Sequence, residues 1–261
     1  MELGLSGKVA LVAASSKGLG KASALALARE GARVTICART EADLETAAAE
    51  IRAETGADVL AVPADLTSAP GIDSVVTATA DRFGGIDILV DNSGGPPIGS
   101  FGNLTDDDWR LAFEIVTLNF VRFVRAVTPF MHRNHWGRIV GIQSTSVKQP
   151  VGGIDLSNGT RPGVAGLMKA IMPELARDGI TINLVLPGSF RTDRILGPRG
   201  GESEAAAAER LAAWAAESIP VGRLGDPAEL GSLVAFLASA QAAYITGAVW
   251  QIDGGVISSS V

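Results

Sequence analysis

The run Val9-Ala10-Leu11-Val12-Ala13-Ala14-Ser15-Ser16-Lys17-Gly18-Leu19-Gly20 decides how the rest of the chain is interpreted. Its apolar start predicts a short buried strand, and a helical pattern begins directly after its last glycine. Glycines in such a turn let the backbone approach a phosphate, and the helix N-terminus offers free N–H groups and a positive dipole end. An ordinary turn is the alternative. Because this turn follows the first strand and opens a helix, we favour phosphate binding, although Ala14 carries a Cβ that restricts φ.

The same alternation of strand and helix continues along most of the chain. Buried strands are predicted at Val9–Ala13, Val34–Cys37, Val59–Val62, Ile86–Val90, Arg138–Ile142, Thr181–Leu186 and Val249–Ile252. Helices are predicted at Lys21–Glu30, Glu41–Glu54, Gly71–Phe83 and from Asp106 to about His132. Repeated strand–helix units with right-handed crossovers build a parallel sheet that has helices on both faces. We therefore predict the α/β class, with a single Rossmann-type doubly wound domain over residues 1–261 and about seven parallel strands.

Composition excludes several classes of partner. The chain has 261 residues, 47% of them apolar, and a net charge of −6, which argues against nucleic acid or an anionic membrane. Cys37 is the only cysteine, so no intramolecular disulfide can form, and a reducing compartment is expected. Met1–Lys8 lacks the pattern of a signal peptide, and no apolar run is long enough for a bilayer. We expect a soluble, cytoplasmic protein without a metal site. His132 and His135 are expected on the surface, away from any cofactor.

The end of the second predicted strand bears on which nicotinamide cofactor would bind. NAD sites carry an acid there for the ribose 2′-hydroxyl, whereas this strand ends Cys37-Ala38-Arg39-Thr40. Lys17 lies in the glycine turn, and two cations that converge on one place suit a 2′-phosphate. The alternatives are that Lys17 and Arg39 are solvated cations and that Thr40 matters only as a helix cap. We expect NADP(H), with NAD(H) less favoured.

Further motifs stand at the ends of the later predicted strands. These are Asp65-Leu66, Asp91-Asn92-Ser93-Gly94, Pro187-Gly188 with Thr192, and Gln251–Gly255. In this order, and together with the glycine turn, they resemble the motifs of the short-chain dehydrogenase/reductase family, in particular its 3-oxoacyl-[acyl carrier protein] reductase-like members. The resemblance covers the chain from about Leu5 to Gly255.

The resemblance implies an NADP(H) site in which Asp65 meets the adenine and Thr192 meets the nicotinamide carboxamide. The residues that match the family's cofactor-binding positions are Ala14, Ser16, Lys17, Gly18, Leu19, Gly20, Arg39, Asp65, Leu66, Asn92, Gly94, Pro187, Gly188 and Thr192.

The resemblance also implies a catalytic group, with one departure from the family pattern. Asn119 matches the asparagine that supports a water chain, and Ser144 matches the serine that polarises the carbonyl. Ser157 and Arg161 stand where the family has its proton-transferring tyrosine and its lysine. The single tyrosine of the chain, Tyr244, lies far from these positions in the sequence.

Ser157 and Arg161 cannot simply take over the chemistry of a tyrosine and a lysine. An alkyl hydroxyl is a much weaker acid than a phenol, whose pKa is about 10, and arginine stays protonated. Arg161 can still bind a ribose and, with Ser144, polarise a carbonyl or a carboxylate. Water ordered by Asn119 could supply the proton, or Asp155, for which helix capping is the alternative. Ser157 could instead make room for a bulky substrate or cap the helix, and we expect Ser157 and Arg161 to line an open cleft.

Two segments are placed to contact a substrate, because ligands bind outside the carboxyl ends of the strands in such sheets. Gly94–Gly99 is stiffened by prolines, and the resemblance makes the insert 189–220 a lid. This segment carries arginines and large apolar residues, among them Arg191, Arg194, Arg199, Ile195, Leu196, Leu211 and Trp214. The mixture suits an acidic substrate or an acyl thioester; the alternative is that the arginines are solvated and the apolar residues pack on the core. Gly197–Gly201 is predicted as a mobile turn and Glu204–Glu209 as an exposed helix.

The predicted function is an NADP(H)-dependent oxidoreductase that interconverts a carbonyl and a hydroxyl group, with an altered proton-transfer site. Because the tyrosine and lysine are absent, a non-catalytic NADP(H)-binding protein and a non-redox enzyme on the same fold stay open. A homotetramer is expected, with a homodimer as the alternative, as family members commonly assemble. The long predicted helix has more apolar positions than one buried stripe needs, and Tyr244–Val249 adds an apolar segment. Those helix positions are Phe113, Val116, Phe120, Val124 and Val127.

Overall fold

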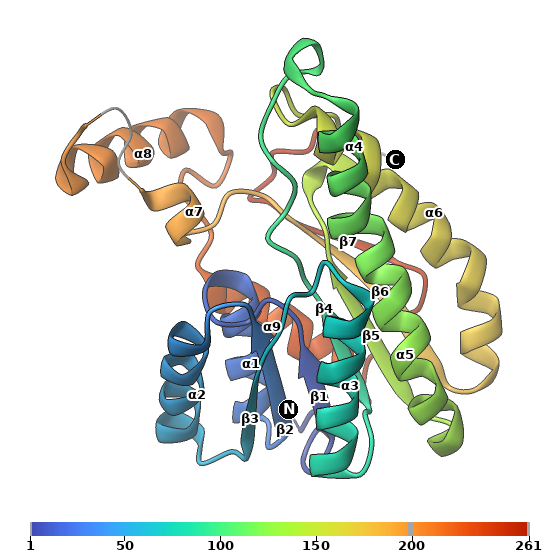
Figure 1. Cartoon of the computed structure of the whole chain (residues 1–261). Coiled ribbons are helices and arrows are strands. Elements are labelled where there is room, and N and C mark those ends of the chain that lie inside the picture. Colours follow the sequence, from blue (N-terminus) through green and yellow to red (C-terminus); the bar gives the residue numbers. More distant parts are fainter. Residues whose placement is uncertain (1, 198–200, 260–261) are drawn as a thin grey trace.

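The computed structural model describes residues 2–197 and 201–259. Seven parallel strands form one sheet in the order β3-β2-β1-β4-β5-β6-β7 (Figure 1). The strands are β1 (Val9–Val12), β2 (Arg33–Ala38), β3 (Val59–Pro63), β4 (Ile88–Asp91), β5 (Gly137–Ile142), β6 (Ile180–Pro187) and β7 (Val249–Ile252). The expected α/β class and doubly wound sheet are therefore confirmed, and each strand lies within two residues of its predicted bounds.

The centre of the sheet contains the point at which the strand order reverses. β1 pairs with β2 on one side and with β4 on the other. The chain moves outward from β1 to β3 and then crosses back to β4, so a ligand crevice is expected outside the carboxyl ends of β1 and β4. The side-chain amide of Asn92, just after β4, donates to the carbonyl oxygen of Ala14 at 3.2 Å. This hydrogen bond ties the two strand ends together.

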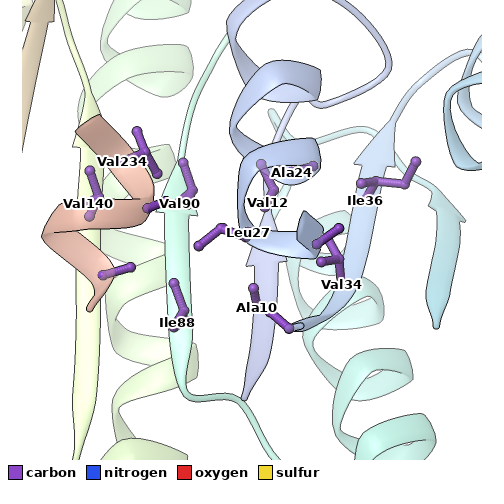
Figure 2. Packing of buried hydrophobic residues seen from close by; sticks show 14 of the residues in the cluster. Ala10, Val12, Ala24, Leu27, Val34, Ile36, Ile88, Val90, Val140 and Val234 are labelled. Atoms are coloured by element: carbon purple, nitrogen blue, oxygen red, sulfur yellow. The ribbon is translucent and has the colours of Figure 1, made fainter. Parts of the chain in front are cut away.

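Helices cover both faces of the sheet because successive residues of a strand point in opposite directions. One face carries α1 (Gly18–Arg29), α2 (Glu41–Thr55) and α9 (Pro227–Ala238), and the other carries α3 (Ala69–Phe83), α5 (Asn119–Asn134) and α6 (Asp155–Arg177) (Figure 1). Figure 2 shows Leu27 of α1 and Val234 of α9 on the face formed by Val12 and Val90. The neighbouring strand residue Leu11 belongs to the core of the opposite face. These two cores hold the strand ends in place.

The predicted helix from Asp106 to about His132 is interrupted. It consists of α4 (Asp106–Phe113), a π-helical turn at Glu114–Leu118, and α5. α4 begins with a capping box in which the Thr105 side chain accepts from the Asp108 N–H. A π-helical turn contains one residue more than an α-helical turn, and such turns are frequent at functional sites. Here the turn ends directly before Asn119.

The apolar surface expected on this helix is mostly absent. Of its five apolar positions, Val116, Phe120, Val124 and Val127 are buried within the chain, and only Phe113 is exposed. They fill the space beneath α5 because the core on this side of the sheet is wide and is shared with α3 and α6. The interpretation of those four residues as an assembly surface is therefore wrong. The ring of Tyr244 is fully exposed.

The segment 189–220 contains α7 (Asp193–Leu196) and α8 (Glu204–Ser218), which stand apart from the helices that cover the sheet (orange in Figure 1). Leu211 packs inward, whereas Leu196 and Trp214 stay exposed. The predicted helix at Glu204–Glu209 is thus present but longer, and Ala207 within it is buried. Within the predicted turn Gly197–Gly201, residues 198–200, which include Arg199, lie outside the described residues.

Candidate functional site

The glycine turn after β1 is held by close backbone contacts. Ala14 adopts a left-handed conformation with φ of 47°, and Gly18 has φ of 57°. A Cβ on Gly20 would lie 2.3 Å from the carbonyl oxygen of Ala14 and 2.9 Å from the amide nitrogen of Asn92. Only glycine fits at that position, since the first turn of α1 passes directly over β1. The turn therefore presents the N-terminus of α1 to the switch point.

A pocket of about 340 Å³ extends from this turn across the ends of β1 to β4. Its lining includes the predicted cofactor residues Ala14, Ser16, Lys17, Arg39, Asp65, Leu66 and Gly94, together with Asn119. Gly18, Leu19 and Gly20 form the first turn of α1 beside it. Thr192 packs over Gly18, because a Cβ there would lie 3.3 Å from the threonine methyl group.

The remaining predicted cofactor residues lie around this pocket without lining it. Asn92 acts through its bond to Ala14. Pro187 ends β6, and a Cβ on Gly188 would lie 2.8 Å from the Cα of Asp253. The packing of two chain segments thus accounts for the glycine at position 188 without a ligand.

The two cations expected to bind a 2′-phosphate differ in their surroundings. Lys17 Nζ lies 2.9 Å from a carboxylate oxygen of Asp43, and this hydrogen bond raises the pKa of Lys17. Arg39 is exposed and forms no ion pair with any carboxylate in the described part of the chain. Thr40 occupies the N-cap position of α2, but its side chain makes no capping bond. Arg39 is therefore the more available phosphate ligand.

Asp65 is partly occupied by its own turn. The Thr67 N–H and hydroxyl both donate to one carboxylate oxygen, at 3.0 and 2.8 Å. These bonds hold the pKa of Asp65 below its usual value. The second carboxylate oxygen is left to meet a ligand in the pocket.

Three of the four predicted catalytic residues meet at a second, smaller cavity. Ser144, Ser157, Arg161 and Arg194 line it together with Pro96, Pro97, Ile98 and Ile154, and its volume is about 100 Å³. Ser157 is 7% exposed and Arg161 is 6% exposed. The expectation of an open cleft at these two positions is thus wrong, because the proline-rich loop and Arg194 cover them.

Hydrogen bonds fix the orientation of these groups. Arg161 Nε donates to Ser157 Oγ at 3.1 Å, and its Nη1 donates to Gln143 Oε1 at 3.1 Å. The hydroxyls of Ser157 and Ser146 lie 3.0 Å apart. Ser144 Oγ accepts from the Ser146 N–H and keeps its own proton to donate into the cavity. Ser157 thus orients Arg161 and is not the helix cap, a position that Ile154 occupies.

Asp91, at the end of β4, is a buried acid for which only the family motif gave a sequence signal. It is 2% exposed, and its Oδ1 has no hydrogen-bond partner among the described residues. Burial raises the pKa of Asp91 to about 7, against the opposing effect of the Arg161 charge. Burial and the nearby charge of Arg194 lower the pKa of Arg161 to about 10. Gln143, which accepts from Arg161, gave no sequence signal.

Asn119, the fourth predicted catalytic residue, lines the larger pocket. Its amide donates to the Leu66 carbonyl at 2.7 Å, and its own Oδ1 is buried without a partner. Buried acceptors of this kind usually bond to ordered water. Asp155, by contrast, accepts from the N–H of Phe101 at 2.7 Å and thereby holds the proline-rich loop. It does not line the cavity that contains Ser144.

The two histidines lie outside these pockets. His132 lies 2.7 Å from Asp178 and His135 is exposed, both at the carboxyl end of α5 and away from the glycine turn. Within the described residues, no group of three or more His, Cys, Asp and Glu side chains could hold a metal ion. None of the helices over residues 2–197 and 201–259 combines the length and apolar character needed to cross a bilayer.

Sequence comparison assigns the family. A family model described as enoyl-(acyl carrier protein) reductase matches residues 13–257. The 3-oxoacyl-[acyl-carrier-protein] reductase of Vibrio cholerae is 36% identical over 261 residues, which cover 97% of this chain and 99% of that protein. The chain belongs to the short-chain dehydrogenase/reductase family.

Solved structures of this family share the fold over its whole length. The L-sorbose reductase of Gluconobacter frateurii, complexed with NADPH and L-sorbose, matches with a TM-score of 0.93 and 31% identity, over 99% of this chain and 100% of that one. An actinorhodin polyketide ketoreductase with NADPH matches with a TM-score of 0.86 and 34% identity, over 95% and 97%. NADPH in both relatives agrees with the cofactor expected from Lys17 and Arg39.

The left-handed backbone of Ala14 predicts that glycine is better at this position. Ala14→Gly should raise the free energy of unfolding by roughly 0.5–1.5 kcal/mol, since a left-handed non-glycine residue costs about 1–2 kcal/mol and the freer unfolded glycine offsets part of the gain. Urea unfolding measures the difference. Ala13→Gly, at a buried neighbour with ordinary φ, is the control and should destabilise. Equal destabilisation by both changes would contradict the strain at Ala14.

The buried carboxyl of Asp91 predicts a pH dependence of stability. Its folded pKa of about 7 lies above the value of an unfolded aspartate, so the folded chain binds more protons between about pH 4 and pH 7 and loses stability as the pH rises through that window. Asp91→Asn removes this loss. Thermal unfolding at pH 4 and at pH 8 measures the effect. Between these two pH values the free energy of unfolding of the variant should rise, relative to that of wild type, by more than about 1.4 kcal/mol, the equivalent of one pKa unit. A pH-independent difference would show that Asp91 ionises normally.

Proposed function

We propose that this protein is an NADP(H)-dependent oxidoreductase that interconverts a carbonyl and a hydroxyl group, with an altered proton-transfer site. One observation carries the proposal: the larger pocket beside the glycine turn and the smaller cavity beside Ser144 adjoin each other at Gly95. Gly95 lines the pocket, and a Cβ on it would lie 2.6 Å from Arg194 and 3.4 Å from Arg161. A dinucleotide that extends along the pocket would therefore end beside Ser144.

The residues present fit such a cofactor. The turn at Ala14–Gly20 leaves backbone N–H groups for a pyrophosphate, and Arg39 is available for a 2′-phosphate. When bound, NADPH supplies the hydride that reduces the carbonyl carbon. Arg161, fixed by Ser157 and Gln143, provides the positive charge near the ribose that the family lysine would otherwise give. The segment 189–220 acts as a lid, with Arg194 reaching over to the carbonyl of Gly94.

The proton-transfer step relies on different groups from those of the family pattern. Ser144 donates its free hydroxyl proton as a hydrogen bond to the substrate oxygen, where negative charge develops. Ser157 already accepts from Arg161 and bonds to Ser146, so it acts as a positioning residue. We infer that a water molecule bonded to Asn119 Oδ1 gives up the proton that completes the hydroxyl, and that the hydroxide left behind takes a proton from solvent through the larger pocket.

A non-catalytic NADP(H)-binding protein is the second candidate. Two observations favour it: a cavity of about 100 Å³ beside Ser144, and the burial of the groups that replace the tyrosine and lysine. Ligand pockets of enzymes usually measure about 300–1,000 Å³. The proposed lid would have to open before a larger substrate could enter.

Assembly and location complete the proposal. The exposed side chains of Leu111, Phe113 and Tyr244 support a homotetramer or a homodimer. Light scattering at micromolar concentration measures the oligomeric state, and a monomer would exclude both the tetramer and the dimer. A cytoplasmic location is proposed because the chain has a single cysteine, Cys37, and therefore no intramolecular disulfide, which suits a reducing compartment. Cell fractionation would test it, and recovery of the protein outside the cytoplasm would exclude it.

Activity should depend on Ser144 if the proposed chemistry operates. In a broad panel of ketones, diketones and oxoacids, at least one compound should oxidise NADPH, and Ser144→Ala should lower kcat about 100-fold, as loss of an oxyanion donor does. Ser74→Ala on the exposed surface of α3 is the control and should leave kcat unchanged. NADPH binding without turnover above the Ser144→Ala level for every compound would replace this proposal with the non-catalytic one.

Cofactor choice should depend on Arg39. Wild type should bind NADPH more tightly than NADH, and Arg39→Ala should weaken NADPH binding about tenfold or more, because a charged hydrogen bond contributes roughly 1.5–3 kcal/mol. Fluorescence titration of both cofactors measures the two affinities. NADH is the internal control, since it lacks the 2′-phosphate and should respond little. Equal affinities in wild type would overturn the assignment of NADP(H).

A further inference from the structure

The small cavity beside Ser144 contains two guanidinium groups without an ion-pair partner among the described residues. Arg161 from α6 and Arg194 from α7 both line it. Neither forms an ion pair with a carboxylate in the described part of the chain, and the buried Asp91 acts on the Arg161 charge only from beyond ion-pair distance. The other lining residues are two serines and apolar side chains.

Arg161 is oriented so that one of its donors is left over. Its Nε and Nη1 donate to Ser157 and Gln143. Its Nη2 has no partner among the described residues and points toward Gly95, 3.4 Å from the position of a Cβ there. The residue is only 6% exposed. A guanidinium donor that opens onto a cavity lined otherwise by serines, apolar side chains and a second arginine would gain a charged hydrogen bond from a bound anion.

Arg194 approaches the same place from the opposite side. Its Nη1 donates to the carbonyl oxygen of Gly94 and would lie 2.6 Å from a Cβ on Gly95. Because both guanidinium groups approach Gly95, their like charges repel each other, and the Arg194 charge is part of what lowers the pKa of Arg161. A negative group bound between the two arginines would be attracted to both, and this attraction would offset their mutual repulsion.

We propose that this cavity is a carboxylate subsite, in which Arg161 and Arg194 bind the acid group of a short oxoacid while Ser144 bonds to its carbonyl oxygen. This inference rests on the proposed oxidoreductase function. The planar guanidinium fork matches the two oxygens of a carboxylate. A volume of about 100 Å³ leaves space for only a few non-hydrogen atoms beyond that group. A short free acid fits this space better than the acyl thioester that the sequence also allowed.

The anion could in principle be a phosphate of the cofactor instead of the carboxylate of a substrate. The two sources differ in which affinity depends on Arg194. A substrate subsite makes Arg194 matter for oxoacids and not for NADPH, whereas a cofactor contact gives the opposite result. Arg194 is exposed, so its replacement leaves the fold intact.

The experiment measures binding without turnover. Calorimetry of the NADP⁺-saturated protein with pyruvate, acetoacetate and levulinate is compared with the methyl esters of the same acids. At least one acid should bind tenfold or more tightly than its ester, and Arg194→Gln should abolish that preference. Arg161→Gln should do the same if it folds. Arg191→Gln, from the same segment but outside the cavity, is the matched control and should change nothing.

Each other outcome overturns the inference. Equal binding of every acid and its ester, or no binding of any acid at millimolar concentration, would show that the cavity does not select a carboxylate. An NADPH affinity that falls tenfold in Arg194→Gln, with the acid preference unchanged, would assign Arg194 to the cofactor and not to a substrate acid. Because the readout is affinity, a failure of NADPH turnover with preserved acid binding would count against the oxidoreductase alone.

Discussion

The structure depends on one close contact, between the carbonyl oxygen of Ala14 and the first turn of α1. A Cβ on Gly20 would lie only 2.3 Å from that oxygen, so glycine allows α1 to pass close over it. Asn92 bonds to the same oxygen from the end of β4. One carbonyl therefore fixes a helix and two strands at the switch point. The left-handed conformation of Ala14 is the local strain that this arrangement requires.

The fold was predictable because local and global signals agree. Strands such as β6 are buried along nearly their whole length, so they appear in the sequence as continuous apolar runs. The π-helical turn at Glu114–Leu118 was not predictable, since its apolar spacing differs from that of an α-helix by one residue within a single turn. The interpretation of Val124 and Val127 as exposed was wrong because the core beneath α5 is wide. An apolar pattern in the sequence does not show how many neighbouring elements cover each residue.

The candidate site was predictable only in part. Motifs at strand ends located the residues of the larger pocket, since the carboxyl ends of parallel strands meet at one edge. Charge pairing was beyond the sequence, because the ion pair between Lys17 and Asp43 follows from the position of α2, which offers no such partner to Arg39 in the part of the chain that the structure describes. The cover over Ser157 and Arg161 was also missed, because it comes from Pro96–Ile98 and Arg194, far apart in the chain and brought together by the fold.

Ser157 and Arg161 are best understood as one unit. They are four residues apart on α6, where side chains are neighbours, and the arginine Nε donates to the serine hydroxyl. A tyrosine at position 157 would fill the cavity and remove this acceptor, leaving a buried guanidinium with one bond fewer. A lysine at position 161 could not reach Gln143 and Ser157 with two directed donors of a planar group while keeping a third for the cavity. The small residue and the large cation thus depend on each other, and together they hold a fixed positive charge beside Ser144.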